Sequence, residues 1–253
     1  MAKPVPGVLD DGEREQIEAT FGVDSEQVAR DHVISHALAA ISSLSTDDVV
    51  FFGGTALSRT HLTELRLSAD IDLIALGDRS AIADEIEEAV ARQLRRSFGT
   101  VTFTPRLREA RHPHPSVMQV GDVRVQIQLL SSEGYPQWPT EIVDIEQRYS
   151  DAPPARLRVL TPAAFVASKL SSWNDREAPR DLYDLWALAE AGYIDATASE
   201  VFGRWGPYTR ASKVSFAHLP SAAEWSASLD HQCLPAVTPE EAASRVRDAL
   251  RNL

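Results

Sequence analysis

The chain has 253 residues, of which 43% are hydrophobic, and its formal net charge is -12. This length allows one large domain or two modest ones, each with a real core. No apolar run approaches the ~20 residues that span a bilayer, and no signal-like hydrophobic region follows Met1-Ala2-Lys3-Pro4, so we expect a cytoplasmic protein without a membrane partner. The single Cys233 cannot form an internal disulfide, which is consistent with a reducing compartment.

The negative charge argues against a nucleic-acid partner, because its long-range field repels phosphate. Net charge is an average, however, and basic residues gather in one stretch of the chain. This stretch either forms a local basic surface or consists of a solvated helix face and a loop, and the sequence leaves both open. The residues are Arg92, Arg95, Arg96, Arg106, Arg108 and Arg111, followed by His112 and His114.

Residues 1–23 lack periodicity and are expected to be irregular. Asp24 followed by Gln27 has the spacing of a helix start, and apolar residues then recur at helical intervals as far as Ile41, which predicts an amphipathic helix that covers a sheet. The next predicted elements are a strand over 49–52, a helix over 56–67, a strand over 71–76, a helix over 80–98 and a strand over 101–104.

Two apolar runs between Val117 and Leu130 are separated by Gly121-Asp122, which predicts a β-hairpin. In the second strand of this hairpin the apolar residues alternate with Arg124, Gln126 and Gln128, which therefore face the other way.

Residues 131–154 are rich in prolines, acids and turn residues and mark the expected boundary between two domains, 1–150 and 151–253. After them, Thr161-Pro162 is a helix start with a capping hydroxyl and a first-turn proline. Further helices are expected from Pro179 to Gly192 and over 239–250.

A glycine pair, Gly53-Gly54, follows the first predicted strand. Glycines let the backbone approach an anion closely, and the helix that follows aims its first amides at that anion. Thr55 adds a hydroxyl at the same point. The alternative is that these residues form only a tight turn.

Asp70 and Asp72 are two apart on a predicted strand and therefore point to the same face. Two carboxylates on one face repel each other unless a cation lies between them, which favours a Mg²⁺ site. The alternative is a pair of exposed acids on an edge strand, but the apolar Ile71 and Leu73 indicate a strand that enters the core. Magnesium held by such a pair bridges the phosphates of a nucleotide.

A second set of charged residues lies in the C-terminal half: Lys169, Arg180, Asp181 and Asp184. The two acids are three apart on a helix and share a face. They either form a surface ion-pair network with Lys169 and Arg180, or they complete a metal site or accept a proton while the lysine binds triphosphate.

Taken together, these segments resemble the AbiEii family of nucleotidyltransferase toxins, which belongs to type IV toxin–antitoxin and abortive-infection systems and includes the mycobacterial MenT toxins. The glycine turn alone fits the wider polymerase-β-like superfamily, whereas the lysine followed by Arg-Asp-x-x-Asp-Leu is much more specific. The resemblance covers most of the chain, and its segments are Arg30-Asp31, Phe52–Leu57, Leu67–Leu73, Thr161-Pro162, Lys169-Leu170 and Arg180–Leu185.

The resemblance implies an α+β fold, in which a polymerase-β-like nucleotidyltransferase core, a mixed sheet flanked by helices, precedes a helical C-terminal domain and the active site lies in the cleft between them. Asp70 and Asp72 would hold Mg²⁺, and Asp184 would be the essential C-terminal acid. The residues expected to bind the nucleotide are Gly53, Gly54, Thr55, Lys169, Arg180 and Asp181.

By the same resemblance the substrate is an NTP, with CTP or another pyrimidine nucleotide favoured, and the acceptor is the 3′ end of tRNA, so that charging and translation stop. A separately encoded antitoxin neutralises such toxins. We also expect a monomer.

One departure concerns the third carboxylate, which polymerase-β-like enzymes usually place on the strand beside the first two. Here the corresponding strand offers Gln126 and Gln128. Glutamine cannot act as a base, so either Asp184 takes over that role or general-base help is weak.

Two other hypotheses compete with the tRNA toxin. The protein could be a nucleotidyltransferase that modifies a small molecule such as an aminoglycoside, which suits an acidic chain better. It could also be a catalytically dead relative that only binds a partner, although Asp70, Asp72, Lys169 and Asp184 are all present.

Overall fold

The computed structural model describes residues 4–253, which form two compact units. The N-terminal unit contains the described residues up to Tyr135 together with Ile142–Val159. The C-terminal unit contains Pro136–Glu141 and Leu160–Leu253. The expected boundary after residue 150 thus precedes β7 (Ala155–Leu160), whereas the units divide near the end of that strand.

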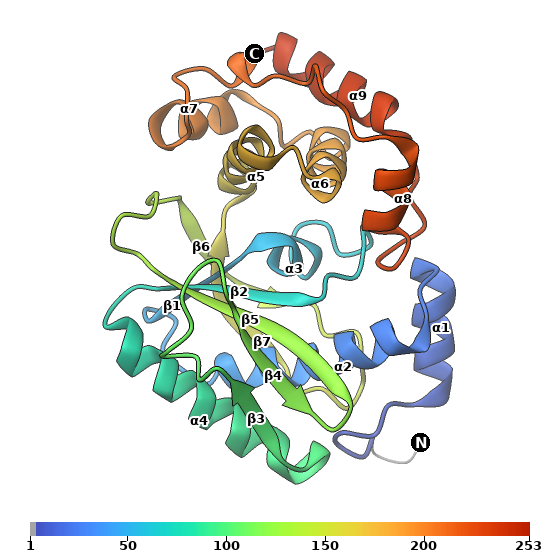
Figure 1. Cartoon of the computed structure of the whole chain (residues 1–253), viewed down its shortest axis with the longest axis vertical. Coiled ribbons are helices and arrows are strands. Elements are labelled where there is room, and N and C mark those ends of the chain that lie inside the picture. Colours follow the sequence, from blue (N-terminus) through green and yellow to red (C-terminus); the bar gives the residue numbers. More distant parts are fainter. Residues whose placement is uncertain (1–3) are drawn as a thin grey trace. The chain divides into compact units, whose positions relative to one another are not determined.

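A seven-stranded mixed sheet, with the strand order β3-β4-β5-β2-β1-β7-β6, dominates the N-terminal unit (Figure 1). Strand β1 pairs antiparallel with β2 and parallel with β7, and β2 is parallel to β5. The expected mixed sheet flanked by helices is confirmed. The strands are β1 (Val49–Phe52), β2 (Asp70–Ala75), β3 (Val101–Thr104), β4 (Ser116–Val120), β5 (Val123–Ser131), β6 (Thr140–Ile145) and β7.

The predicted hairpin corresponds to β4 and β5, which are antiparallel and joined by Gly121-Asp122. Val125, Ile127 and Leu129 are buried, whereas Arg124 and Gln126 are exposed. The alternation read from the sequence therefore separates a core face of the sheet from an open face.

Two long helices, α2 (Ser25–Ile41) and α4 (Arg79–Phe98), pack on each other and on β5. They cover the core face of the sheet. Helix α4 is amphipathic, with Ile82, Ile86, Val90 and Leu94 buried. Helix α2 is buried on most sides and includes polar buried residues such as Asp31, which need internal partners.

The expectation of an irregular start is wrong for residues 11–21, which form helix α1 (Asp11–Phe21). Asp10 caps this helix by accepting hydrogen bonds from the amides of Gly12 and Glu13, and Gly22 ends it in the left-handed conformation. Only Phe21 of this helix is buried, so the apolar periodicity is weak although both helix-end signals are present.

The helix expected over 56–67 is also wrong in extent, because α3 spans only Gly53–Ser58. The chain turns after it because Arg59 is fully buried and binds partners outside the helix. Its guanidinium donates to Asp31 Oδ1 at 2.7 Å and to the Glu146 carbonyl at 2.8 Å.

The Asp31 carboxylate is the centre of a buried polar network. Besides Arg59, it lies 3.5 Å from Arg148 Nη1, and it accepts a hydrogen bond of 3.0 Å from the Tyr149 hydroxyl. Burial, together with the nearby charge of Arg59, lowers the pKa of Arg148 to about 10. The network joins α2, the residue after α3 and the segment after β6.

The C-terminal unit is mainly helical. Thr161 caps its first helix by accepting from the Ala164 amide, and Pro162 stands in the first turn, as expected. Within this unit α5 packs on α6 and α7, and α6 packs on α8 and α9. The helices are α5 (Pro162–Arg176), α6 (Pro179–Glu190), α7 (Ala196–Trp205), α8 (Ala222–Leu229) and α9 (Pro239–Arg251). None of the described helices is both long and apolar enough to cross a membrane.

Asp31→Asn should lower the free energy of unfolding by about 3 kcal/mol or more, because it leaves two buried guanidinium groups without their counter-charge. Urea unfolding measures this change. Asp47→Asn is the control, since it removes a carboxylate that is 81% exposed and pairs with Arg158, and should cost less than about 1 kcal/mol. Equal effects of the two substitutions would contradict the importance of the network.

Candidate active site

The glycine turn and the two aspartates adjoin each other, because antiparallel pairing places Phe52 opposite Asp72. Gly53 follows Phe52 with φ +80, and a Cβ atom at Gly53 would overlap the Asp72 carboxylate. Only glycine therefore combines this backbone conformation with such a close approach. Two motifs that are separate in the sequence form one local structure.

A buried cation, Arg66, lies at the second glycine of the turn. A Cβ atom at Gly54 would overlap the Arg66 guanidinium and would lie 3.1 Å from Ser68 Oγ. Arg66 is only 2% exposed. The sequence analysis did not predict a role for Arg66. The only indication in the sequence is that Arg66 lies between the glycine turn and Asp70.

Thr55 ties the two motifs together. It is buried, and its hydroxyl donates a hydrogen bond to the backbone carbonyl of Asp70. The hydroxyl thus fixes α3 against β2, and its expected contact with a triphosphate stays a prediction.

Asp70 and Asp72 lie half-buried on the same face of β2, which is a central strand between β1 and β5. The alternative of an exposed pair on an edge strand is therefore wrong. Their partners on β5 are Gln126 and Gln128, as expected, so the strand beside the two aspartates offers amides at these positions and no carboxylate. Two carboxylates beside bare glycine backbone fit Mg²⁺, which takes one or two protein carboxylates and fills its other positions with phosphate oxygens and water.

An imidazole lies next to these amides. Gln128 Nε2 is 2.8 Å from Nδ1 of the exposed His112. An imidazole thus contacts the strand that itself offers only glutamine. The sequence placed His112 only in the basic stretch and gave no signal of this contact.

Two arginines of the basic stretch, Arg106 and Arg108, do not form an unpaired basic surface. Arg106 binds Asp84 and Glu87, both at 3.0 Å, and Arg108 binds Asp84 at 2.9 Å. These acids belong to α4 and cancel the charge locally. For these residues the structure shows the second alternative, a solvated helix face and a loop.

The C-terminal site residues form a buried ion cluster. Lys169 Nζ lies 2.6 Å from Asp184 Oδ2 and 3.1 Å from Asp181 Oδ1. Both carboxylates are almost wholly inaccessible, and Lys169 is 7% exposed. The alternative of a surface network is therefore wrong for these three residues.

The second cation of this cluster is Arg176, not Arg180. Arg176 Nε lies 2.7 Å from Asp181 Oδ2, and Arg180 is half-buried at the start of α6. Burial alone would raise the pKa of Asp181, but the charges of Lys169 and Arg176 outweigh burial and lower it below the ordinary value. Asp181 is thus ionised and holds both cations.

His32, His36 and Asp151 form another group of buried metal-ligand types, away from the predicted site residues in the sequence. The histidines are one helical turn apart on α2. Each Nε2 donates to the carboxylate, from His32 to Oδ1 at 2.9 Å and from His36 to Oδ2 at 3.0 Å. The Gly7 amide also donates to this carboxylate, at 2.7 Å. The three side chains satisfy one another and link α2 to the loop before β7.

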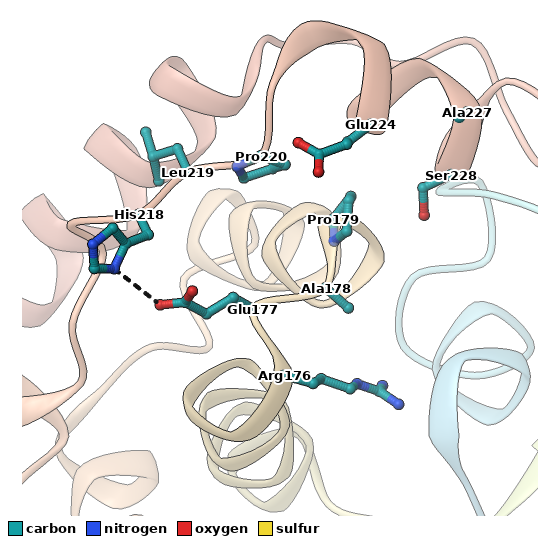
Figure 2. Close-up of a pocket in the computed structure, with 10 residues that line it drawn as sticks. All are labelled: Arg176, Glu177, Ala178, Pro179, His218, Leu219, Pro220, Glu224, Ala227 and Ser228. Atoms are coloured by element: carbon teal, nitrogen blue, oxygen red, sulfur yellow. Dashed lines mark ion pairs between the residues drawn. The ribbon is translucent and has the colours of Figure 1, made fainter.

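A cavity of about 660 Å³ lies within the C-terminal unit, at the turn between α5 and α6. Figure 2 shows the residues that line it. His218 Nδ1 and Glu177 Oε1 lie 3.8 Å apart in its wall. None of the predicted site residues is among the described residues of this wall, and we assign it no function. The wall consists of Arg176, Glu177, Ala178, Pro179, His218, Leu219, Pro220, Glu224, Ala227 and Ser228.

The chain is similar to proteins of known fold and family. The family model of the nucleotidyl transferase AbiEii toxin, type IV toxin–antitoxin system, matches residues 36–251. No curated protein matches the chain.

Two solved structures have a similar fold. One is the MenT4 nucleotidyltransferase toxin of Mycobacterium tuberculosis, with 18% identity, a TM-score of 0.69, and coverage of 95% of this chain and 90% of that chain. The other is a protein from H. pylori that is described as a nucleotidyltransferase, with 12% identity, a TM-score of 0.55, and coverage of 91% and 95%.

Acid should destabilise the N-terminal unit through His36. Burial lowers the pKa of His36 below its usual value of 6.5. Below pH 6.5 the unfolded chain therefore binds this proton more readily than the folded chain, so the stability that depends on neutral His36 is complete above that pH and is lost as the pH falls. Urea unfolding between pH 7.5 and 5.5 measures the loss.

The matched variant is His36→Gln, which removes this titration. Its stability should fall less steeply over the same pH range than that of the wild type. Parallel pH curves for the two proteins would contradict the assignment to His36.

Proposed function

Because the chain belongs to the AbiEii family of nucleotidyltransferase toxins of type IV toxin–antitoxin systems, we propose that it transfers a nucleoside monophosphate from an NTP to the 3′ acceptor end of tRNA and so inhibits translation. One observation supports the enzymatic part most directly. The glycine turn packs against Asp72, so a phosphate-binding backbone and a pair of metal-binding carboxylates share one place.

In this proposal Asp70 and Asp72 would hold Mg²⁺, which when bound would supply positive charge to offset that of the phosphates. The backbone at Gly53 and Gly54, with Thr55, contacts the triphosphate. The fixed hydrogen bond from Thr55 to the Asp70 carbonyl holds these elements in register before any ligand arrives. Positioning of this kind is the main catalytic resource in phosphoryl transfer.

Lys169 binds a phosphate of the nucleotide, and Asp184 acts as the essential acid of the C-terminal unit, with Arg180 and Asp181 in the nucleotide-binding set. The ion cluster supports a division of labour between the two acids. Asp181 holds Arg176 as well as Lys169, whereas Asp184 has the shorter contact with the lysine. A phosphate that binds Lys169 therefore competes with the contact between this lysine and Asp184.

The remaining parts of the proposal follow from the family. The sheet is the polymerase-β-like core, the nucleotide is CTP or another pyrimidine nucleotide, and a separately encoded antitoxin neutralises the protein, which acts as a monomer in the cytoplasm. The alternative activity, modification of a small molecule such as an aminoglycoside, is favoured only by the net charge of -12.

The direct test is incubation of the purified protein with each labelled NTP and total RNA, with and without Mg²⁺. Label should appear at the 3′ end of tRNA for one NTP or for a few, and chelation of the metal should abolish it. Label in no RNA under any nucleotide would refute the tRNA proposal, and label on an aminoglycoside would favour the alternative.

Asp72→Asn should reduce transfer at least ~100-fold and abolish growth inhibition, because it removes a metal-binding charge while keeping the shape of the side chain beside Gly53. Thermal unfolding should stay near that of the wild type. The control is Asp122→Asn, in the exposed hairpin turn, which should leave transfer unchanged. A toxic Asp72→Asn protein would overturn the metal assignment.

Lys169→Ala should weaken NTP binding at least ~10-fold, since it removes the proposed phosphate contact. It also leaves two buried carboxylates with less compensation, so thermal unfolding must be measured on the same protein. Lys213→Ala is the matched control, because it removes an exposed lysine of the same unit that lies outside the cluster and should leave nucleotide affinity nearly unchanged. Wild-type NTP affinity in a folded Lys169→Ala protein would exclude this role.

A further inference from the structure

A cavity of about 420 Å³ lies directly beside Asp70 within the N-terminal unit. One wall comes from β2 and from the hairpin of β4 and β5, and the other from α2. Its lining residues are Arg30, Ala69, Asp70, Val117, Arg124 and Gln126. Two arginines therefore share a small space with a predicted metal ligand.

The strand register places Arg124 on the same face as the aspartates. Asp70 pairs with Gln126, and Arg124 is two residues before Gln126 on β5, so its side chain leaves the sheet on that face. On β4, Gln119 lies opposite Arg124, and Val117 lies opposite Gln126. Along these three strands, Arg124 is the only cation on the face that carries Asp70 and Asp72.

Arg30 forms a fixed part of the cavity wall. Its Nε donates to the backbone carbonyl of Arg124 at 3.1 Å, and its Nη1 donates to Gln27 Oε1 at 2.6 Å. Its Nη2 pairs with Glu26 at 2.8 Å, but that carboxylate is 80% exposed and its charge is well screened. Arg30 thus steadies the β5 backbone at Arg124 and adds positive potential to the cavity.

Arg124 differs from the paired arginines of the basic stretch, Arg106 and Arg108. Arg106 and Arg108 bind acids of α4, whereas within residues 4–253 no carboxylate pairs with the exposed Arg124 guanidinium. An arginine without a carboxylate partner beside Asp70 is suited to bind a phosphate, because its planar guanidinium can donate two parallel hydrogen bonds to phosphate oxygens.

We propose that Arg124, supported by Arg30, binds a backbone phosphate of the RNA acceptor next to its reacting 3′ end. This inference rests on the proposed transfer to RNA and deepens it, because it names the side chain that holds the acceptor. A single-stranded 3′ end carries a phosphate one nucleotide before its terminal hydroxyl, so anchoring that phosphate beside Asp70 delivers the hydroxyl to the metal-binding carboxylates. A cationic aminoglycoside, in contrast, is repelled by both arginines.

The first experiment measures steady-state transfer by Arg124→Gln with a tRNA acceptor. The KM for the acceptor should rise about tenfold while the KM for the NTP stays unchanged, and the salt dependence of acceptor binding should lose about one unit of slope. Arg96→Gln is the matched control, because Arg96 is an exposed arginine on α4 outside this face, and its acceptor KM should match the wild type. An unchanged acceptor KM in Arg124→Gln would overturn the inference.

The second experiment uses acceptor RNAs in which one linkage near the 3′ end is an uncharged methylphosphonate. One position should weaken binding to the wild type about tenfold and have no further effect on Arg124→Gln, which identifies the phosphate that this side chain holds. Additive losses at every position would contradict a direct contact.

RNA binding should also be measured by fluorescence anisotropy in the Asp72→Asn background. This measurement distinguishes a failure of the inference about Arg124 from a failure of the proposed transfer to RNA. If the wild type labels RNA but the Arg124 substitution leaves binding unchanged, the inference fails and the proposed function stands. If the wild type labels and binds no RNA, both fail together.

Discussion

The pairing of the buried Asp31 carboxylate with Arg59, Arg148 and Tyr149 is the constraint on which the N-terminal unit depends. A buried anion must be compensated, and its partners come from segments far apart in the sequence: the end of α3 and the stretch after β6. Because α3 begins with the glycine turn, this network also fixes where the turn lies. Arg30, which precedes Asp31 on α2, lines the cavity beside Asp70.

The site itself is assembled from close backbone contact. Gly53 packs against the Asp72 carboxylate, Gly54 against Arg66, and the Thr55 hydroxyl binds the Asp70 carbonyl. The three consecutive residues 53–55 thus each contact a different residue of the segment 66–72. Such contacts tolerate little displacement, and they place charge and bare amides together without a ligand. This preorganisation suits a reaction in which the protein contributes positioning more than covalent chemistry.

The sequence revealed those features whose causes are local. Alternation along β5 follows from the two-residue period of a strand, and the glycine turn and Asp-x-Asp pair need only their immediate neighbours. Features that depend on distant partners could not be read. Helix α3 is short because Arg59 binds the remote Asp31. The cation of the C-terminal cluster is near Asp181 in the sequence, but the geometry of the turn between α5 and α6 selects Arg176 and not Arg180. Strand β6 lies in the stretch rich in turn residues and β7 follows that stretch directly, and β7 joins the sheet by pairing with the remote strand β1.

The C-terminal ion cluster has one consequence of its own. Lys169 and Arg176 carry two positive charges, and Asp181 and Asp184 carry two negative charges, so these four side chains balance one another. Any phosphate that binds Lys169 brings surplus negative charge into a region of low polarity, where such an excess is costly. That surplus must be cancelled by a cation that enters with the phosphate or by a proton taken up by a carboxylate. Electroneutrality thus couples ligand binding in this unit to the movement of a second charge.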